Sequence, residues 1–222
     1  MIDWRVCPDT ADLAAEAGRR IASAAQHAIR RHGMFKLVLA GGSTPLQVYR
    51  LLSATPQDWA RWELFYGDER CLPEGDPDLN RSLVTSTGLV EKVGMHHPIN
   101  VQLGAQRAAL QYARLLEAAM PFDMVLLGMG EDGHTASLFP QHSWPDENVI
   151  AVHDAPKPPS ERVSLSPEAL RNCRQMLVLI SGAAKYDAVA SWRSGEPLPI
   201  ARVTRDVNAE VLLDRAASGD AA

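Results

Sequence analysis

Apolar and polar residues follow one another in blocks that predict strands alternating with helices. Helical spacing is clearest over residues 12–31, where the apolar side chains fall on one face and Gly33 marks the expected end. Further helices are expected over residues 45–52, 80–89, 106–120, 183–192 and 214–217. Another should begin at Pro167, with Ser166 as its N-cap. Short apolar runs typical of buried strands occupy residues 36–40, 63–66, 124–128, 149–153, 176–181 and 207–213.

Alternating helices and fully apolar strands predict an α/β fold. We expect a mostly parallel, Rossmann-like sheet flanked by helices on both faces, because parallel strands are covered on both sides. The chain has no internal repeat, low-complexity tract or Gly/Ser linker. The prediction is therefore a single domain over residues 1–217, followed by a disordered tail at 218–222.

Composition removes several classes of function. Of the 222 residues, 46% are hydrophobic and 22% charged, and the net charge is -5. This balance gives no basic surface for nucleic acid or an anionic membrane. Three widely separated cysteines form neither a disulfide framework nor a metal motif. The start of the chain lacks the pattern of a signal peptide, and no apolar run is long enough to span a bilayer. A soluble, cytoplasmic protein is expected.

The residues that follow each strand carry the candidate chemistry, because ligands of parallel sheets bind beyond the carboxyl ends of the strands. After the first internal strand come Gly41, Gly42, Ser43 and Thr44, and then Pro45. Thr44 is expected to cap a helix that starts at Pro45. Glycines and a helix start together are typical of a phosphate-binding loop, although a plain tight turn has the same pattern.

Two more strand exits are rich in charge. Residues 67–70 read as a loop that carries Asp68 and Arg70. The strand at 124–128 ends in a glycine-rich turn with Asp132 and His134. Packing does not explain an imidazole and a carboxylate at this position, whereas acid/base chemistry does.

The turn at residues 128–133 also fits GxGxxG, with Asp154 about 20 residues further on. Its acidic residues would face a pyrophosphate, and Pro140 leaves little room for the helix that dinucleotide binding requires. Metal binding by His134 with Asp132, His142 or His153 lacks any established spacing. Neither a cofactor nor a metal is therefore expected.

Cations gather in two further segments. Lys157 and Arg162 flank a proline-stiffened loop at residues 156–162, and Lys185 follows the strand at 176–181. A lysine in a first helical turn opposes the helix dipole, which a bound anion would offset. With Arg70 and the glycine-rich helix start, these residues indicate a small phosphorylated ligand.

Five segments resemble the 6-phosphogluconolactonases of the pentose phosphate pathway. They occur in that family's order and span nearly the whole chain. They are LAGGSTP at 39–45, YGDERCLP with DPDLN at 66–80, LLGMGEDGHTASLFP at 126–140, PKPPSER at 156–162 and SGAAK at 181–185. The resemblance implies one α/β domain, related to glucosamine-6-phosphate deaminases, that hydrolyses 6-phosphoglucono-δ-lactone without metal or organic cofactor.

The resemblance also implies roles for single residues. His134 would be the general base that activates water. Gly41, Gly42, Ser43 and Thr44, with Arg162 and Lys185, would hold the phosphate, and Asp68, Arg70 and Lys157 would line the sugar site. The residues themselves leave two roles open. Asp132 either orients the imidazole or binds sugar hydroxyls, and the oxyanion is stabilised either by backbone N–H groups of the 128–133 turn or by Arg70.

The chain departs from this family and its relatives in two places. The last strand reads AEVLL at 209–213, where the family often has a tryptophan. The related deaminases follow their DGH motif with phenylalanine-asparagine-glutamate-proline, whereas this chain has SLFP at 137–140. The acid for ring opening is thus absent, which favours the lactonase. An isomerase or deaminase with Asp68 as the base, and a silent sugar-phosphate sensor, remain as alternatives.

Overall fold

The apolar strands assemble into one seven-stranded sheet in the computed structural model, which describes residues 2–219. The spatial order of its strands is β1-β10-β9-β6-β2-β3-β5, and all neighbours are parallel. Their bounds are β1 Asp3–Cys7, β2 Phe35–Leu39, β3 Trp62–Tyr66, β5 Met95–His96, β6 Phe122–Gly128, β9 Cys173–Ile180 and β10 Ala209–Asp214. The predicted parallel α/β sheet is confirmed.

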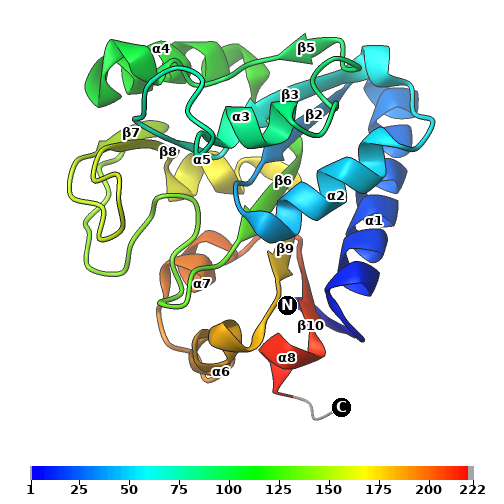
Figure 1. The fold of residues 1–222 in the computed structure, drawn as a ribbon, viewed down its shortest axis with the longest axis vertical. Coiled ribbons are helices and arrows are strands. Elements are labelled where there is room, and N and C mark those ends of the chain that lie inside the picture. Colours follow the sequence, from blue (N-terminus) through cyan, green and yellow to red (C-terminus); the bar gives the residue numbers. More distant parts are fainter. Residues whose placement is uncertain (1, 220–222) are drawn as a thin grey trace.

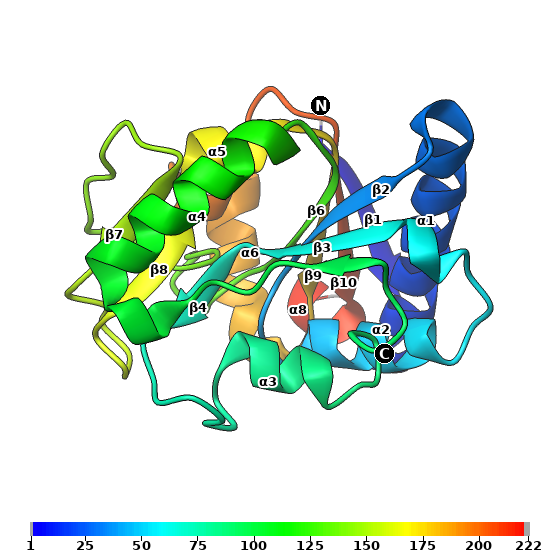
Figure 2. The same ribbon diagram turned by 90° about the horizontal axis from the view of Figure 1, so that it is seen from above.

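Helices cover both faces of this sheet. Figure 2 shows α1 and α2 on one side, and α4, α5 and α6 on the other. The helices are α1 Thr10–His32, α2 Ser43–Ser53, α3 Asn80–Thr85, α4 Ala105–Ala119, α5 Pro167–Arg171, α6 Tyr186–Arg193, α7 Pro199–Val203 and α8 Arg215–Ser218. Three 3₁₀ turns are η1 Trp59–Arg61, η2 Val101–Leu103 and η3 Ala183–Lys185. No helix among residues 2–219 has the length and hydrophobicity to cross a bilayer.

A second, smaller sheet lies beside the first. It is antiparallel, in the order β4-β8-β7, with β4 at Asp68–Arg70, β7 at Val149–Val152 and β8 at Arg162–Leu165. In Figure 1 this sheet lies under α4, to the left of the large sheet. Residues 68–70, predicted as a loop, are therefore a strand, and β8, β1, β5 and α7 were not predicted.

Several local signals act as predicted. Gly33 ends α1 in the left-handed region with φ 88°, which glycine tolerates best. The Ser166 hydroxyl accepts a hydrogen bond from the Ala169 N–H at 3.2 Å and caps α5. The helix predicted over 80–89 ends at Thr85. Of the predicted tail, Ser218 belongs to α8, and residues 220–222 lie outside the described residues.

The order of the strands places a crevice between β2 and β6. On one side of β2 the sheet continues with β3 and β5, which follow β2 along the chain. On the other side it continues with β6, β9 and β10, which come later in the chain. Loops that leave two such neighbouring strands diverge to opposite faces of the sheet, and ligands bind in the gap. The loop after β2 contains residues 41–44, and the loop after β6 contains His134.

Candidate active site

A pocket of about 360 Å³ opens at this crevice. The exits of β2, β3, β6 and β9 all contribute to its wall. It brings together nearly every residue that the sequence nominated: Gly41, Gly42, Ser43, Thr44, Asp68, Arg70, His134, Lys157, Arg162 and Lys185. Asp132 is the exception, since it does not line the pocket but contacts His134 from outside.

The turn after β2 leaves the start of α2 open. The helix begins at Ser43, and its N-cap residue, Gly42, has φ 107°, a backbone conformation that favours glycine. Among residues 2–219, no side chain caps this end. The predicted cap at Thr44 is wrong: Thr44 lies inside the first turn, and its hydroxyl is hydrogen-bonded at 2.6 Å to the Ser181 hydroxyl after β9. The first N–H groups of α2 therefore remain available to an anion.

The turn after β6 holds His134 against Asp132. The His134 Nδ1 is hydrogen-bonded to Asp132 Oδ1, which also accepts the His134 backbone N–H at 3.2 Å. A Cβ added to Gly130 would lie 2.0 Å from that Nδ1, so only glycine permits this arrangement. The imidazole packs 4.9 Å from the ring of Phe139 and is 18% exposed. Its other nitrogen, Nε2, is the one left to meet a ligand.

The pKa of Asp132 reflects the same contact. Partial burial would raise it, but the hydrogen bonds and the charge of His134 outweigh burial and hold it below its usual value. Asp132 is thus a carboxylate that accepts the Nδ1 proton of the ring. That tautomer leaves a lone pair on Nε2, as a general base requires.

Asp68 lines the pocket from β4. It is 6% exposed, and its Oδ2 accepts a hydrogen bond of 2.6 Å from the Ser137 hydroxyl. Its Oδ1 accepts one of 3.1 Å from the side-chain amide of Asn80. These two bonds fix the carboxylate, and Asn80 itself lines the pocket.

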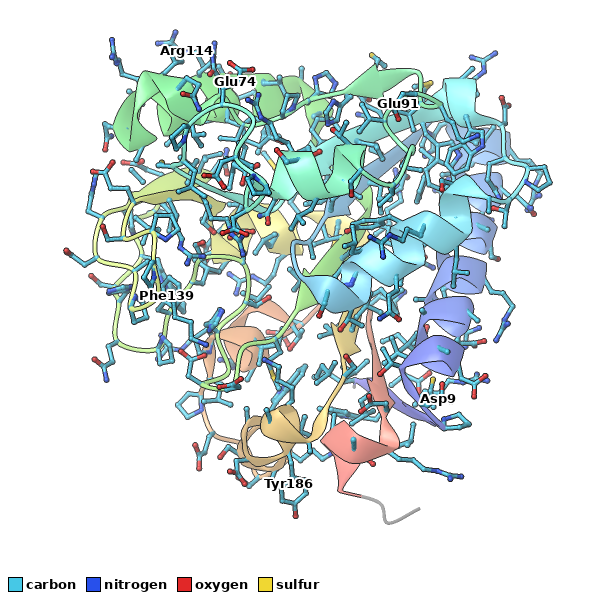
Figure 3. The ribbon with its side chains drawn as sticks, viewed as in Figure 1. Asp9, Glu74, Glu91, Arg114, Phe139 and Tyr186 are labelled. Carbon is cyan, nitrogen blue, oxygen red and sulfur yellow. The ribbon has the colours of Figure 1, made fainter. Side chains whose placement is uncertain are left out.

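Four cations surround the cavity. Arg162 is buried, donates to the carbonyls of Lys157, Pro158 and Pro159, and lies 5.7 Å over the Phe139 ring. Figure 3 shows Phe139 where the loops after β6 and β7 approach each other. Burial lowers the pKa of Arg162. Burial is also the largest of the effects that lower the pKa of Lys185.

Three polar pocket residues, Asn80, Thr135 and Ser181, were missed. Ser181 directly follows β9, so its position at the sheet edge was a usable signal. Asn80 closes the DPDLN segment at 76–80, but nothing in the sequence indicates that its amide reaches Asp68.

The dinucleotide alternative lacks its structural context. Residues 129–148 form turns and no helix, whereas the GxGxxG fingerprint must open one. For the metal alternative, no group of three His, Cys, Asp or Glu side chains within residues 2–219 is placed to hold an ion.

Comparison with known proteins gives a consistent family. The family model for glucosamine-6-phosphate isomerases/6-phosphogluconolactonase matches residues 8–213. A protein of Mycobacterium tuberculosis named 6-phosphogluconolactonase is 36% identical, over 96% of both chains. One of Streptomyces coelicolor is 37% identical over 82% of this chain and 79% of its own.

Solved structures agree. The 6-phosphogluconolactonase of Thermotoga maritima has a TM-score of 0.89 at 26% identity, covering 96% of this chain and all of its own. The enzyme of Trypanosoma brucei also gives 0.89 at 26%, covering 100% and 99%. A monomeric glucosamine-6-phosphate deaminase, 21% identical with a TM-score of 0.85, covers 99% and 100% and shares the fold.

Proposed function

Because the chain belongs to the glucosamine-6-phosphate isomerase/6-phosphogluconolactonase family, we propose that it hydrolyses 6-phosphoglucono-δ-lactone to 6-phosphogluconate. One observation carries the proposal: His134 and the open start of α2 face the same pocket from the two strands that flank the crevice. A ligand with a phosphate at one end and an ester carbonyl at the other matches those two groups.

The phosphate binds at the loop after β2. Free N–H groups at the start of α2 and the positive end of its dipole favour an anion there. Lys185 lines the same pocket and supplies a full positive charge. Arg162 contributes charge from behind, since its guanidinium already donates to three backbone carbonyls. Binding of this end orients the lactone for the chemical step.

His134 then acts as the general base. Its Nε2 takes a proton from water while the water oxygen attacks C1 of the lactone, which forms a tetrahedral oxyanion. The bond between C1 and the ring oxygen breaks next. The ring oxygen leaves as the C5 hydroxyl by taking the proton back from the imidazolium. The new carboxylic acid loses its own proton to solvent. Asp132 keeps the imidazole in the required tautomer and stabilises its charged form.

Arg70 is the better of the two candidates for stabilising the oxyanion. The N–H groups of Gly130 and Gly133 already donate to the carbonyls of His134 and Gly130. Arg70 lines the pocket and carries a positive charge; its Nη1 donates to the Asp78 carbonyl at 2.6 Å, whereas its Nε has no hydrogen-bond partner within residues 2–219. A cation at a developing negative charge lowers the barrier most where water is excluded.

An isomerase or deaminase that uses Asp68 as its base fits less well. Each oxygen of that carboxylate already accepts a hydrogen bond, from Ser137 or from Asn80. The products discriminate between these reactions, since a deaminase releases ammonia and an isomerase forms a ketose.

The test generates the lactone in situ by oxidising glucose 6-phosphate and follows 6-phosphogluconate with and without the protein. Spontaneous hydrolysis is subtracted. A net rate that increases with protein concentration supports the proposal. Tight binding of 6-phosphogluconate with no net hydrolysis would refute it and favour a sugar-phosphate sensor.

A further inference from the structure

A fully buried carboxylate, Glu69, lies beneath the pocket. It is 0% exposed, and its Oε1 accepts the backbone N–H groups of Arg70 at 2.8 Å and Asn80 at 2.7 Å. Its Oε2 accepts the N–H of Arg81 at 2.9 Å. The N-cap residue of α3, Leu79, has no side chain able to do this. Glu69 therefore fastens the start of α3 to β4.

The residue fastened in this way is Asn80, which is 2% exposed. Its Nδ2 donates to the Asp68 backbone carbonyl at 2.9 Å and to Asp68 Oδ1 at 3.1 Å. Its Oδ1 has no hydrogen-bond partner within residues 2–219 and faces Gly41, where an added Cβ would lie only 2.1 Å away. The amide thus lies between the loop after β2 and the carboxylate of Asp68.

We propose that Asn80 is a positioning residue that fixes the separation of the phosphate-binding loop from Asp68, and that Glu69 holds it in place. This inference rests on the proposed function, because it assigns the two walls to the two ends of a phosphorylated lactone. A buried amide with one oxygen unpaired is costly, so packing alone does not account for asparagine here. Spacing between the walls matters only to a ligand that touches both.

The consequence separates positioning from general structural support. In the proposed site, inorganic phosphate contacts the loop after β2 and Lys185 but not Asp68, and α2 and the bond from Thr44 to Ser181 hold this loop without Asn80. The product, 6-phosphogluconate, spans both walls. Loss of the Asn80 amide should therefore weaken the product and leave phosphate nearly unchanged.

The experiment compares Asn80→Ala with Asn100→Ala, a control at an exposed asparagine. Dissociation constants for inorganic phosphate and 6-phosphogluconate are measured by calorimetry, and kcat/KM by net lactone hydrolysis. For Asn80→Ala we expect phosphate affinity within about threefold of wild type, product affinity at least about tenfold weaker, and kcat/KM lower by about 10–100-fold. Equal weakening of both ligands, or no weakening of the product, would overturn the proposal.

Two further variants guard against a folding defect. Asn80→Asp keeps the size of the side chain but removes both donors to Asp68, so it should show the same selective loss; wild-type product affinity would contradict the inference. Gly41→Ala introduces a methyl that collides with the Asn80 amide. In the Asn80→Ala background, Gly41→Ala should weaken 6-phosphogluconate binding by less than about a further threefold. Fully additive losses of affinity in the double variant would argue against the contact between residues 41 and 80.

The outcomes also distinguish this inference from the proposed function. Absence of net hydrolysis by the wild-type protein would refute the lactonase, and the two binding constants would still report on Asn80. If the wild type is active and Asn80→Ala has the same kcat/KM, only the positioning role is refuted.

Discussion

A single methyl group at Gly130 should disable the enzyme by displacing His134. The Cβ of alanine would lie 2.0 Å from His134 Nδ1 and 2.7 Å from Asp132 Oδ1. Since ordinary contacts begin at 3.4 Å, the imidazole must move by about 1.4 Å, the difference of these distances. The φ of Gly130 is not in the left-handed region, so alanine adds a clash and no backbone strain.

A displacement of this size would separate the proposed base, His134, from its water. Misplacement by about 1 Å costs about 10²-fold, and complete loss of general-base catalysis about 10²–10⁴-fold. We expect kcat/KM for Gly130→Ala to fall within that range, a rise of about 3–5 kcal/mol in the barrier.

The assay is net hydrolysis of lactone generated in situ, and 6-phosphogluconate binding serves as the check that the pocket persists. Gly18→Ala, in the middle of α1 where no atom lies within 4 Å of the new methyl, is the matched control. A folded Gly130→Ala variant with kcat/KM within about threefold of wild type would refute the placement of His134 as the base.

Three further results are expected. Asp132→Asn should lower kcat by about 10²-fold with little change in KM, because the Nδ1–H of His134 loses its carboxylate; an unchanged kcat in steady-state kinetics would contradict this. Burial is the main cause that lowers the pKa of Lys185 below the usual 10.5, so Lys185 should lose its charge at a lower alkaline pH than a free lysine does. Calorimetry should therefore show the affinity for 6-phosphogluconate falling at that lower pH, and Lys185→Met should abolish this pH dependence. Burial raises the pKa of Glu69 from 4.5 to about 7, so the folded protein retains a proton that the unfolded chain loses. The free energy of unfolding should therefore fall from about pH 4.5 to 7, by up to about 3 kcal/mol, and urea titrations should show a flatter slope for Glu69→Gln.

The central strands of the large sheet were predicted because they are buried on both faces, whereas the largely exposed β1 and the two-residue β5 were not. The runs after Lys36, Glu63 and Asp123 are almost purely apolar, and each became a central parallel strand. The order of these strands along the chain, and the glycines that follow them, were enough to predict the edge of the sheet at which the pocket lies.

The small sheet was predicted only in part: the apolar β7 matches the strand expected at 149–153, but β4 and β8 were missed because they carry polar residues of the site. β4 consists of Asp68, Glu69 and Arg70, and β8 includes Arg162 and Ser164; all but Arg70 are buried through contacts with distant partners. Hydrophobic periodicity cannot detect strands of this kind. The same limit applies to Thr44, since its bond to a serine 137 residues away replaces the local cap that its position suggested.

The most direct test of the account is lactone hydrolysis by His134→Ala. We predict a loss of about 10²–10⁴-fold in the net rate above spontaneous hydrolysis, with 6-phosphogluconate affinity within about threefold of wild type. A folded His134→Ala protein that hydrolyses the lactone at nearly the wild-type rate would contradict the central claim.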